Sequence, residues 1–278
     1  MTHEASESQV VPEAGQAPDS RDRPGRSKVP EVTVSFWMIK VLCTTVGETA
    51  ADLLNKKAGL GLTGVSVLMS ALLAVVLVIQ FRSGAYRPGV YWSAVALISV
   101  VTTLASDDLT DIMGVPPEAS TTVFALLLAV VFVVWYRRER ILSVRHIDTT
   151  SRESFYWSAV LSTFALGTTA GDLVSERIDL GYWLSAVLYA VVIAAVALAH
   201  FALDLDGLWS FWIAYVLTRP LGASTGDYLS RPIGDGGLGL GTVVTSALFL
   251  AVIFGLVVHL SVTRRDAAEP ERVSGHLA

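Results

Sequence analysis

The stretch Trp157–Asp172, WSAVLSTFALGTTAGD, decides how this chain is built, because its spacing occurs three more times. In every copy a tryptophan is followed fifteen residues later by an aspartate, inside or at the end of a long apolar segment. The other copies are Trp37/Asp52, Trp92/Asp107 and Trp212/Asp227. Intervals of 55 residues within each half and 120 between the halves indicate that a two-repeat unit was itself duplicated. The chain is therefore predicted to be a repeat protein.

The composition is that of a membrane protein, with 53% hydrophobic residues, 16% charged residues and a mean hydropathy of +0.56. Most of its apolar runs approach the roughly 20 residues that cross a bilayer as a helix. The runs are Val34–Leu54, Val65–Phe81, Val90–Leu109, Thr121–Tyr136, Phe155–Val174, Tyr182–Phe201, Leu208–Leu229 and Thr242–Val262. We expect an all-α integral membrane protein with eight transmembrane helices.

The repeats divide the chain into four tandem two-helix units, pictured as hairpins. Because each unit has an even number of helices, all four enter the membrane in the same direction, which predicts pseudo-symmetry along the membrane normal. The first 30 residues and the last 15 are polar and are expected to be disordered tails. The expected segments are a tail at 1–30, repeats at 31–86, 87–145, 146–206 and 207–263, and a tail at 264–278.

Lysine and arginine are distributed unequally between the two ends of the predicted bundle. One end carries most of them, in both tails and in the even-numbered connections, and the other has only Lys56, Lys57, Arg177 and Arg231. Cytoplasmic loops are enriched in these residues. We therefore expect a multi-pass protein of the plasma (inner) membrane with both termini in the cytoplasm.

Small and oxygen-bearing residues form a stripe on the helices that begin each repeat. Positions eight, eleven and fifteen after the tryptophan share one helix face. Carboxylates in hydrocarbon are costly and mark functional sites, and sites with only oxygen ligands favour a hard cation or a proton. The predicted ion or proton pathway comprises Glu48, Asp52, Thr103, Asp107, Asp111, Thr168, Asp172 and Asp227.

A structural interpretation of the same residues has equal weight. Each repeated aspartate could instead cap a short turn at the start of an external loop. The tryptophans are interpreted as anchors at the membrane interface, and Lys40 as a side chain that reaches the cytoplasmic surface. Arg219, beside Pro220, is expected to be a counter-ion for the carboxylates or a substrate contact, and could bond carbonyls freed by the proline.

Three segments resemble a bacterial family described as an uncharacterised membrane-anchored protein. They are Lys28-Val-Pro-Glu-Val-Thr33, Thr44-Thr-Val-Gly-Glu-Thr49 and Thr218-Arg-Pro-Leu-Gly-Ala-Ser-Thr-Gly-Asp227. The resemblance covers about residues 28–263 and implies a multi-pass bacterial inner-membrane protein with internal repeats. It implies no activity.

The leading hypothesis is a transporter or channel that moves a hard cation or proton along the central acidic pathway. The alternatives are a non-transporting scaffold or accessory subunit, and a proton-coupled permease for a small anionic solute that meets Arg219. The sequence lacks nucleotide-binding and hydrolase motifs, so we expect no enzyme activity. We expect no cofactor beyond a possible bound hard cation, and as partners the lipid bilayer and an ion or small solute, but no nucleic acid.

Overall fold

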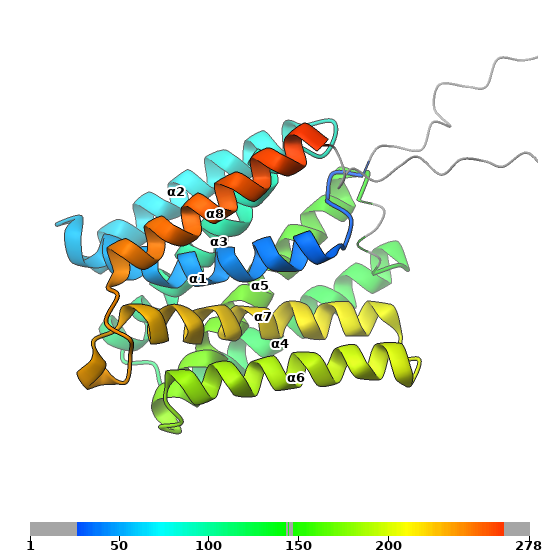
Figure 1. Ribbon diagram of the computed structural model, residues 1–278. Coiled ribbons are helices and arrows are strands. Elements are labelled where there is room, and N and C mark those ends of the chain that lie inside the picture. The colour runs from blue at the N-terminus through cyan, green and yellow to red at the C-terminus, as the bar shows by residue number, and fades with distance from the viewer. Residues whose placement is uncertain (1–26, 143, 145–146, 264–278) are drawn as a thin grey trace, which may run out of the picture.

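The protein is described by a computed structural model that covers residues 27–142, 144 and 147–263 (Figure 1). The part of the chain that it describes contains eight α-helices, as expected, with two short π-helical turns and one 3₁₀ turn. The elements are α1 Val34–Lys57, α2 Gly61–Arg82, α3 Pro88–Asp107, η1 Asp108–Ile112, α4 Pro117–Glu139, α5 Thr150–Asp172, η2 Leu173–Arg177, α6 Tyr182–Ala202, α7 Gly207–Ser230, η3 Ile233–Asp235 and α8 Thr242–Thr263.

Local sequence signals set where several helices begin. Thr33 and Thr149 precede α1 and α5, and their hydroxyl oxygens accept hydrogen bonds from first-turn backbone N–H groups. Asp206 does the same for α7. Pro88 and Pro117 occupy the first position of α3 and α4, where the missing N–H has no intrahelical partner to lose.

The helices form an inner group and an outer group (Figure 1). The inner helices are those that begin each repeat, and α1 contacts α3, α3 contacts α5, α5 contacts α7, and α7 contacts α1, which closes a ring. The outer helices α2, α4, α6 and α8 bury only 11–22% of their most apolar stretch, against 61% for α3. The helices that carry the repeated Trp and Asp therefore do meet in the centre.

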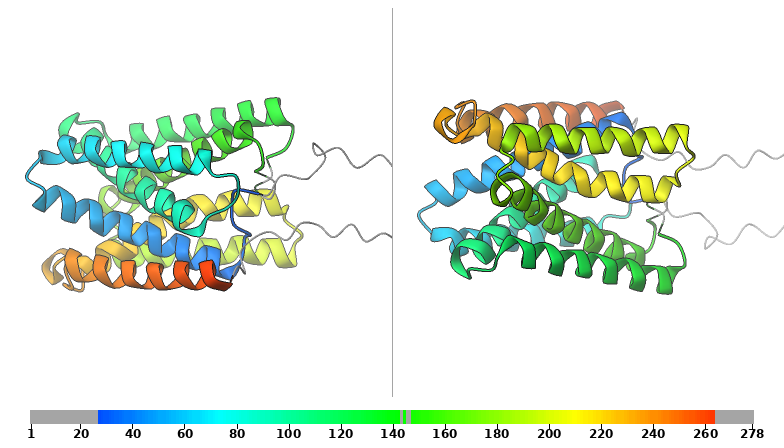
Figure 2. Two further views of the ribbon diagram at one scale, coloured as in Figure 1. Left: turned by 90° about the horizontal axis from the view of Figure 1, so that it is seen from above. Right: turned by 90° about the horizontal axis from the view of Figure 1, so that it is seen from below.

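Each outer helix packs mainly on the next repeat and not on its own. The main neighbours are α3 for α2, α5 for α4, α7 for α6, and α1 for α8, which lies beside α1 in Figure 2. By contrast, α1 and α2 share few contacts. The four repeats are therefore not packed as separate hairpins, because each outer helix packs on the inner helix of the next repeat and α8 packs on α1.

Five helices are long and apolar enough to cross a membrane: α2, α3 extended through η1, α4, α6 and α8. The other three, α1, α5 and α7, carry buried charged side chains in the interior. The start of α1 and the end of α8 lie at the same end of the bundle (Figure 1). We call this the terminal end, and the opposite one the loop end.

Most of the segment expected to be a disordered N-terminal tail lies outside the described residues, as does the C-terminal tail at 264–278. Residues 27–30, however, are described and pack against the bundle. The Lys28 ammonium is 2.7 Å from Glu153 Oε2, and Lys28 N donates to Ile147 O. The described chain thus packs against the bundle before the first helix begins.

Candidate functional site

A buried network of charged and hydroxyl groups joins three inner helices. Arg219 on α7 is fully buried, and its Nη2 lies 3.0 Å from Glu48 Oε2 on α1. The same Nη2 also bonds the hydroxyl of Thr103 on α3, which in turn is 3.2 Å from Glu48 Oε2. Arg219 thus pairs with Glu48 in the structure, and its described hydrogen bonds go to Glu48 and Thr103 rather than to the carbonyls near Pro220.

Lys40 lies closer to the terminal end than Glu48 does, and its side chain does not reach the surface. Its ammonium is fully buried, donates to Tyr215 O at 2.8 Å and to the Thr218 hydroxyl, and sits 3.8 Å from the centre of the Tyr215 ring. The interpretation of Lys40 as a snorkelling side chain is therefore wrong. Backbone carbonyl, hydroxyl and aromatic faces replace the water that an ammonium loses on burial.

The network occupies a single stripe of α1. Lys40, Thr44, Glu48 and Asp52 are spaced four residues apart and so share one face of the helix. At about 1.5 Å per residue the stripe is about 18 Å long. Arg219 and Asp227 on α7 are eight residues apart, and Arg231, which follows directly after the helix, is four residues beyond Asp227. The sequence analysis did not place Lys40, Thr44 and Arg231 in the network, and these spacings were the signal that could have identified them.

Three of the four repeated aspartates gather around Glu48 at the loop end. Asp107 interacts electrostatically with Glu48, Asp52 and Arg219, and Asp227 interacts with Glu48 and Asp52. Asp227 is buried and lies 3.1 Å from Arg231 Nε, whereas Asp52 pairs with the exposed Lys56 at 3.0 Å. Asp52 and Asp107 are thus partly buried, whereas Asp227 and Glu48 are both buried.

The remaining predicted pathway residues take other roles. Asp172 accepts a hydrogen bond from Ser106 Oγ at 3.1 Å. The Thr168 hydroxyl donates to the Phe164 carbonyl of its own helix, and Asp111 is exposed. Asp111 follows Asp107 within the wider π-helical turn η1, and it interacts electrostatically with Asp107.

The capping alternative is not realised at two of the four aspartates. Asp107 and Asp172 precede η1 and η2, and neither side chain makes a capping hydrogen bond to the turn that follows. Among the described residues, no three His, Cys, Asp or Glu side chains lie close enough together to hold a metal ion. Glu48, Asp52, Asp172 and Asp227 each pair with a cation or a hydroxyl group.

Glycines allow the inner helices to approach closely enough to form this network. A Cβ built on Gly222 of α7 would overlap the Thr44 side chain of α1, and one on Gly47 would overlap Ser99 of α3. A Cβ on Gly167 of α5 would stand 2.7 Å from Arg219 Cβ. Small residues at helix crossings are the usual means of tight association in membranes.

Aromatic side chains fill the bundle on the terminal side of Lys40. Trp92, Trp157 and Trp212 are buried, and within the described residues their indole N–H groups lack hydrogen-bond partners. The interpretation of the tryptophans as interface anchors is wrong for these three. They pack with Tyr91, Tyr156 and Tyr215 into a cluster that closes this end of the centre.

The comparisons with known proteins agree with this repeated architecture. The family described as "Repeat of Unknown Function (DUF347)" matches residues 35–86, 90–141, 155–204 and 210–266. The chain belongs to this family. No curated protein and no solved structure matches the chain. Each matched segment contains one inner helix and the outer helix that follows it, so the four family repeats correspond to the four sequence repeats.

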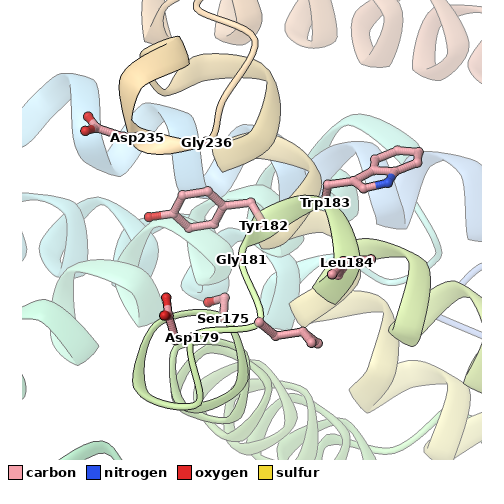
Figure 3. Close-up of a pocket in the computed structure, with 9 residues that line it drawn as sticks. Ser175, Asp179, Gly181, Tyr182, Trp183, Leu184, Asp235 and Gly236 are labelled. Atoms are coloured by element: carbon pink, nitrogen blue, oxygen red, sulfur yellow. The ribbon is translucent and has the colours of Figure 1, made fainter.

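A small pocket of about 420 Å³ opens beside the loop end of the network (Figure 3). Ser175, Asp179, Tyr182 and Asp235 are among its lining residues. The guanidinium of Arg231 lies 5.1 Å from the centre of the Tyr182 ring and also pairs with Asp227. Burial alone would lower the pKa of Arg231, but the Asp227 carboxylate outweighs it, so the pKa lies above its ordinary value. Arg231 therefore stays charged at the border between this pocket and the buried carboxylates.

Proposed function

We propose that the protein is a multi-pass transporter of the bacterial plasma membrane that moves protons along the face shared by α1 and α7. The observation that carries the proposal is the buried Arg219–Glu48–Thr103 network, with further carboxylates on its loop side and an aromatic cluster beyond Lys40. The asymmetry of basic residues supports cytoplasmic termini. The resemblance to bacterial membrane-anchored proteins and the fourfold repeat of the contacts support the membrane location and pseudo-symmetry along the membrane normal.

The charges favour a proton over a metal cation. A metal ion approaching Glu48 would be repelled by Arg219 and by Lys40, both fully buried. A proton, in contrast, needs no coordination sphere and changes only the charge of the carboxylate that receives it. Asp52, Asp107 and Asp227 provide successive acceptors between the loop end and Glu48.

Protonation of Glu48 supplies a reason for the bundle to rearrange. In the structure described here, Glu48 neutralises Arg219 at 3.0 Å. A proton on Glu48 leaves the guanidinium buried without its counter-charge, which costs several kcal/mol. Movement of α7 relative to α1 would relieve that cost and open the aromatic closure toward the terminal end. The proton is thus the ligand that shifts the conformational equilibrium.

The test is proton flux into liposomes that contain the purified protein and a pH-sensitive dye, driven by a potassium diffusion potential. We expect Glu48→Gln to lower flux at least tenfold, Glu48→Asp to retain part of it, and Asp107→Asn to lower it. Glu139→Gln is the matched control, because Glu139 pairs with Arg152 outside the network. Unchanged flux in a folded Glu48→Gln variant would sink the proposal, and a wild-type protein without flux would favour the scaffold.

A second candidate, a proton-coupled permease for a small anion, is favoured by one observation. Arg219 Nε and Nη1 are buried and, among the described residues, have no hydrogen-bond partner. A guanidinium with free N–H groups can receive a carboxylate or phosphate. This function predicts that proton flux through the wild-type protein requires an added anion. It also predicts that Arg219→Gln abolishes uptake of the anion and the dependence of proton flux on it.

A further inference from the structure

A groove of about 1430 Å³ lies at the terminal end of the described part of the chain. It lies between α4 and the connection after it on one side, and α6, α7 and the start of α1 on the other. Along α7 its lining extends from Gly207 to Leu221. The groove therefore runs about 21 Å along α7, at about 1.5 Å per residue. This length exceeds the thickness of one leaflet, which is half of a hydrocarbon core of about 30 Å.

The two ends of the groove differ in chemistry. Its mouth is lined by Arg137, Arg140 and His200, with the exposed aromatic side chains of Tyr136 and Trp209 beside them. Deeper in, the lining is aliphatic, and includes Val41, Ile193 and Leu221. The order of charged mouth, aromatic belt and apolar depth matches the order of headgroup, interface and acyl chain in a leaflet.

The arginines at the mouth are not used inside the protein. Arg137 and Arg140 are exposed, and neither makes an ion pair with any described residue. The acidic side chain closest to them in sequence, Glu139, is already paired with Arg152 at 3.0 Å. Two guanidinium groups that have no ion-pair partner among the described residues, next to an apolar groove, suit an anion that also carries hydrocarbon.

We propose that this groove binds one anionic phospholipid, with its phosphate between Arg137 and Arg140 and an acyl chain along α7 to Thr218. This inference rests on the membrane location proposed above but not on proton transport. The deep end gives the lipid a role, because Thr218 lines the groove and its hydroxyl accepts from the Lys40 ammonium. A bound chain therefore packs against the outer side of the charged network and stabilises the arrangement of α1 and α7.

Native mass spectrometry of the detergent-solubilised full chain tests the site, with phosphatidylglycerol and phosphatidylcholine of identical acyl chains as probes. We expect one tightly bound phosphatidylglycerol, with at least tenfold preference over phosphatidylcholine. The double variant Arg137→Gln/Arg140→Gln should lose that preference. Arg138→Gln is the matched control, since Arg138 is a neighbouring exposed arginine that does not line the groove, and it should keep the preference.

Three results would overturn the site. They are equal binding of the two lipids by the wild type, an undiminished preference in the double variant, or a dimer whose contact excludes the lipid. A groove-filling variant, Ala214→Trp, should abolish binding of the acyl chain while the arginines remain. The lipid site and transport fail independently: lipid binding without proton flux removes only the transporter, and flux without lipid preference removes only this site.

Discussion

Arg219 on α7 and Glu48 on α1 are 171 positions apart in the chain, yet their Nη2 and Oε2 atoms lie 3.0 Å apart in the centre of the bundle. One belongs to the last repeat and the other to the first. The pair therefore forms only when α7 returns to α1 and closes the ring of inner helices. It joins the electrostatics of the site to the completeness of the fold.

Breaking this pair from one side should be costly. Glu48→Gln leaves the Arg219 charge buried and uncompensated, and we expect the free energy of unfolding to fall by about 3–5 kcal/mol. The measurement is thermal or denaturant unfolding in a fixed detergent. Asp52→Asn is the comparison, because Asp52 pairs with the exposed Lys56 and such pairs contribute about 0–1 kcal/mol.

The double variant Glu48→Gln/Arg219→Gln should be more stable than Glu48→Gln alone, since it removes both charges from the interior. Additive losses in the double variant would contradict direct coupling between the two residues. The assignment of Glu48 as the counter-charge of Arg219 would then have to be abandoned.

Close contact between α7 and α1 depends on a residue without a side chain. A Cβ added at Gly222 would overlap the Thr44 side chain and approach Thr45 N to 2.9 Å. Gly222→Ala should therefore lower the free energy of unfolding by about 1–3 kcal/mol through overpacking. Gly255→Ala on α8 meets open space and should raise it by about 0.5–1 kcal/mol, as expected when alanine replaces glycine within a helix. Equal effects would mean that the crossing is looser than described.

Lys40 presents a different case, because no carboxylate of the described residues bonds its ammonium, which contacts Tyr215 O, the Thr218 hydroxyl and two aromatic rings. Lys40→Met keeps the length of the side chain and removes a second cation from the neighbourhood of Arg219. We expect a change of less than about 1.5 kcal/mol in the free energy of unfolding, as for other volume-conserving replacements. Lys40→Ala should cost more, because it leaves a cavity. A large loss in Lys40→Met would show that the hydrogen bonds of the ammonium are needed for folding.

The helices and repeats were predictable because they depend on local properties. Apolar length and the Trp-to-Asp spacing set the eight helices, and both are visible in a single chain. The partner of each outer helix was not predictable in the same way. A short loop such as 58–60 suggests that α1 and α2 pack together, but α2 packs on α3 and α8 takes the place beside α1. Only the closure of the ring decides this.

The site was predictable as a stripe but not as a network. The spacing of Glu48 and Asp52 placed both on one face of α1, and the structure brings Asp107 and Asp227 to the same region. Which cation neutralises Glu48 depends on the distance between α1 and α7, which Gly222 sets. The burial of Trp92 and Trp157 also depends on packing. Indole side chains prefer membrane interfaces, but here the four inner helices pack together at the level of these tryptophans and enclose them.

The bridge between Lys28 and Glu153 lies outside every repeat motif and holds the segment before α1 in place. Glu153 is fully buried, receives the Lys28 ammonium at 2.7 Å and accepts from Gln80 Nε2 at 3.2 Å. Glu153→Gln should leave Lys28 without its counter-charge and lower the free energy of unfolding by about 3–5 kcal/mol. Amide hydrogen exchange at residues 27–29 should accelerate as the segment detaches. Glu139→Gln removes a more exposed pair on the same end and should leave that exchange unchanged. Faster exchange in both variants would mean that general loosening of the terminal end, and not this bridge, controls the attachment.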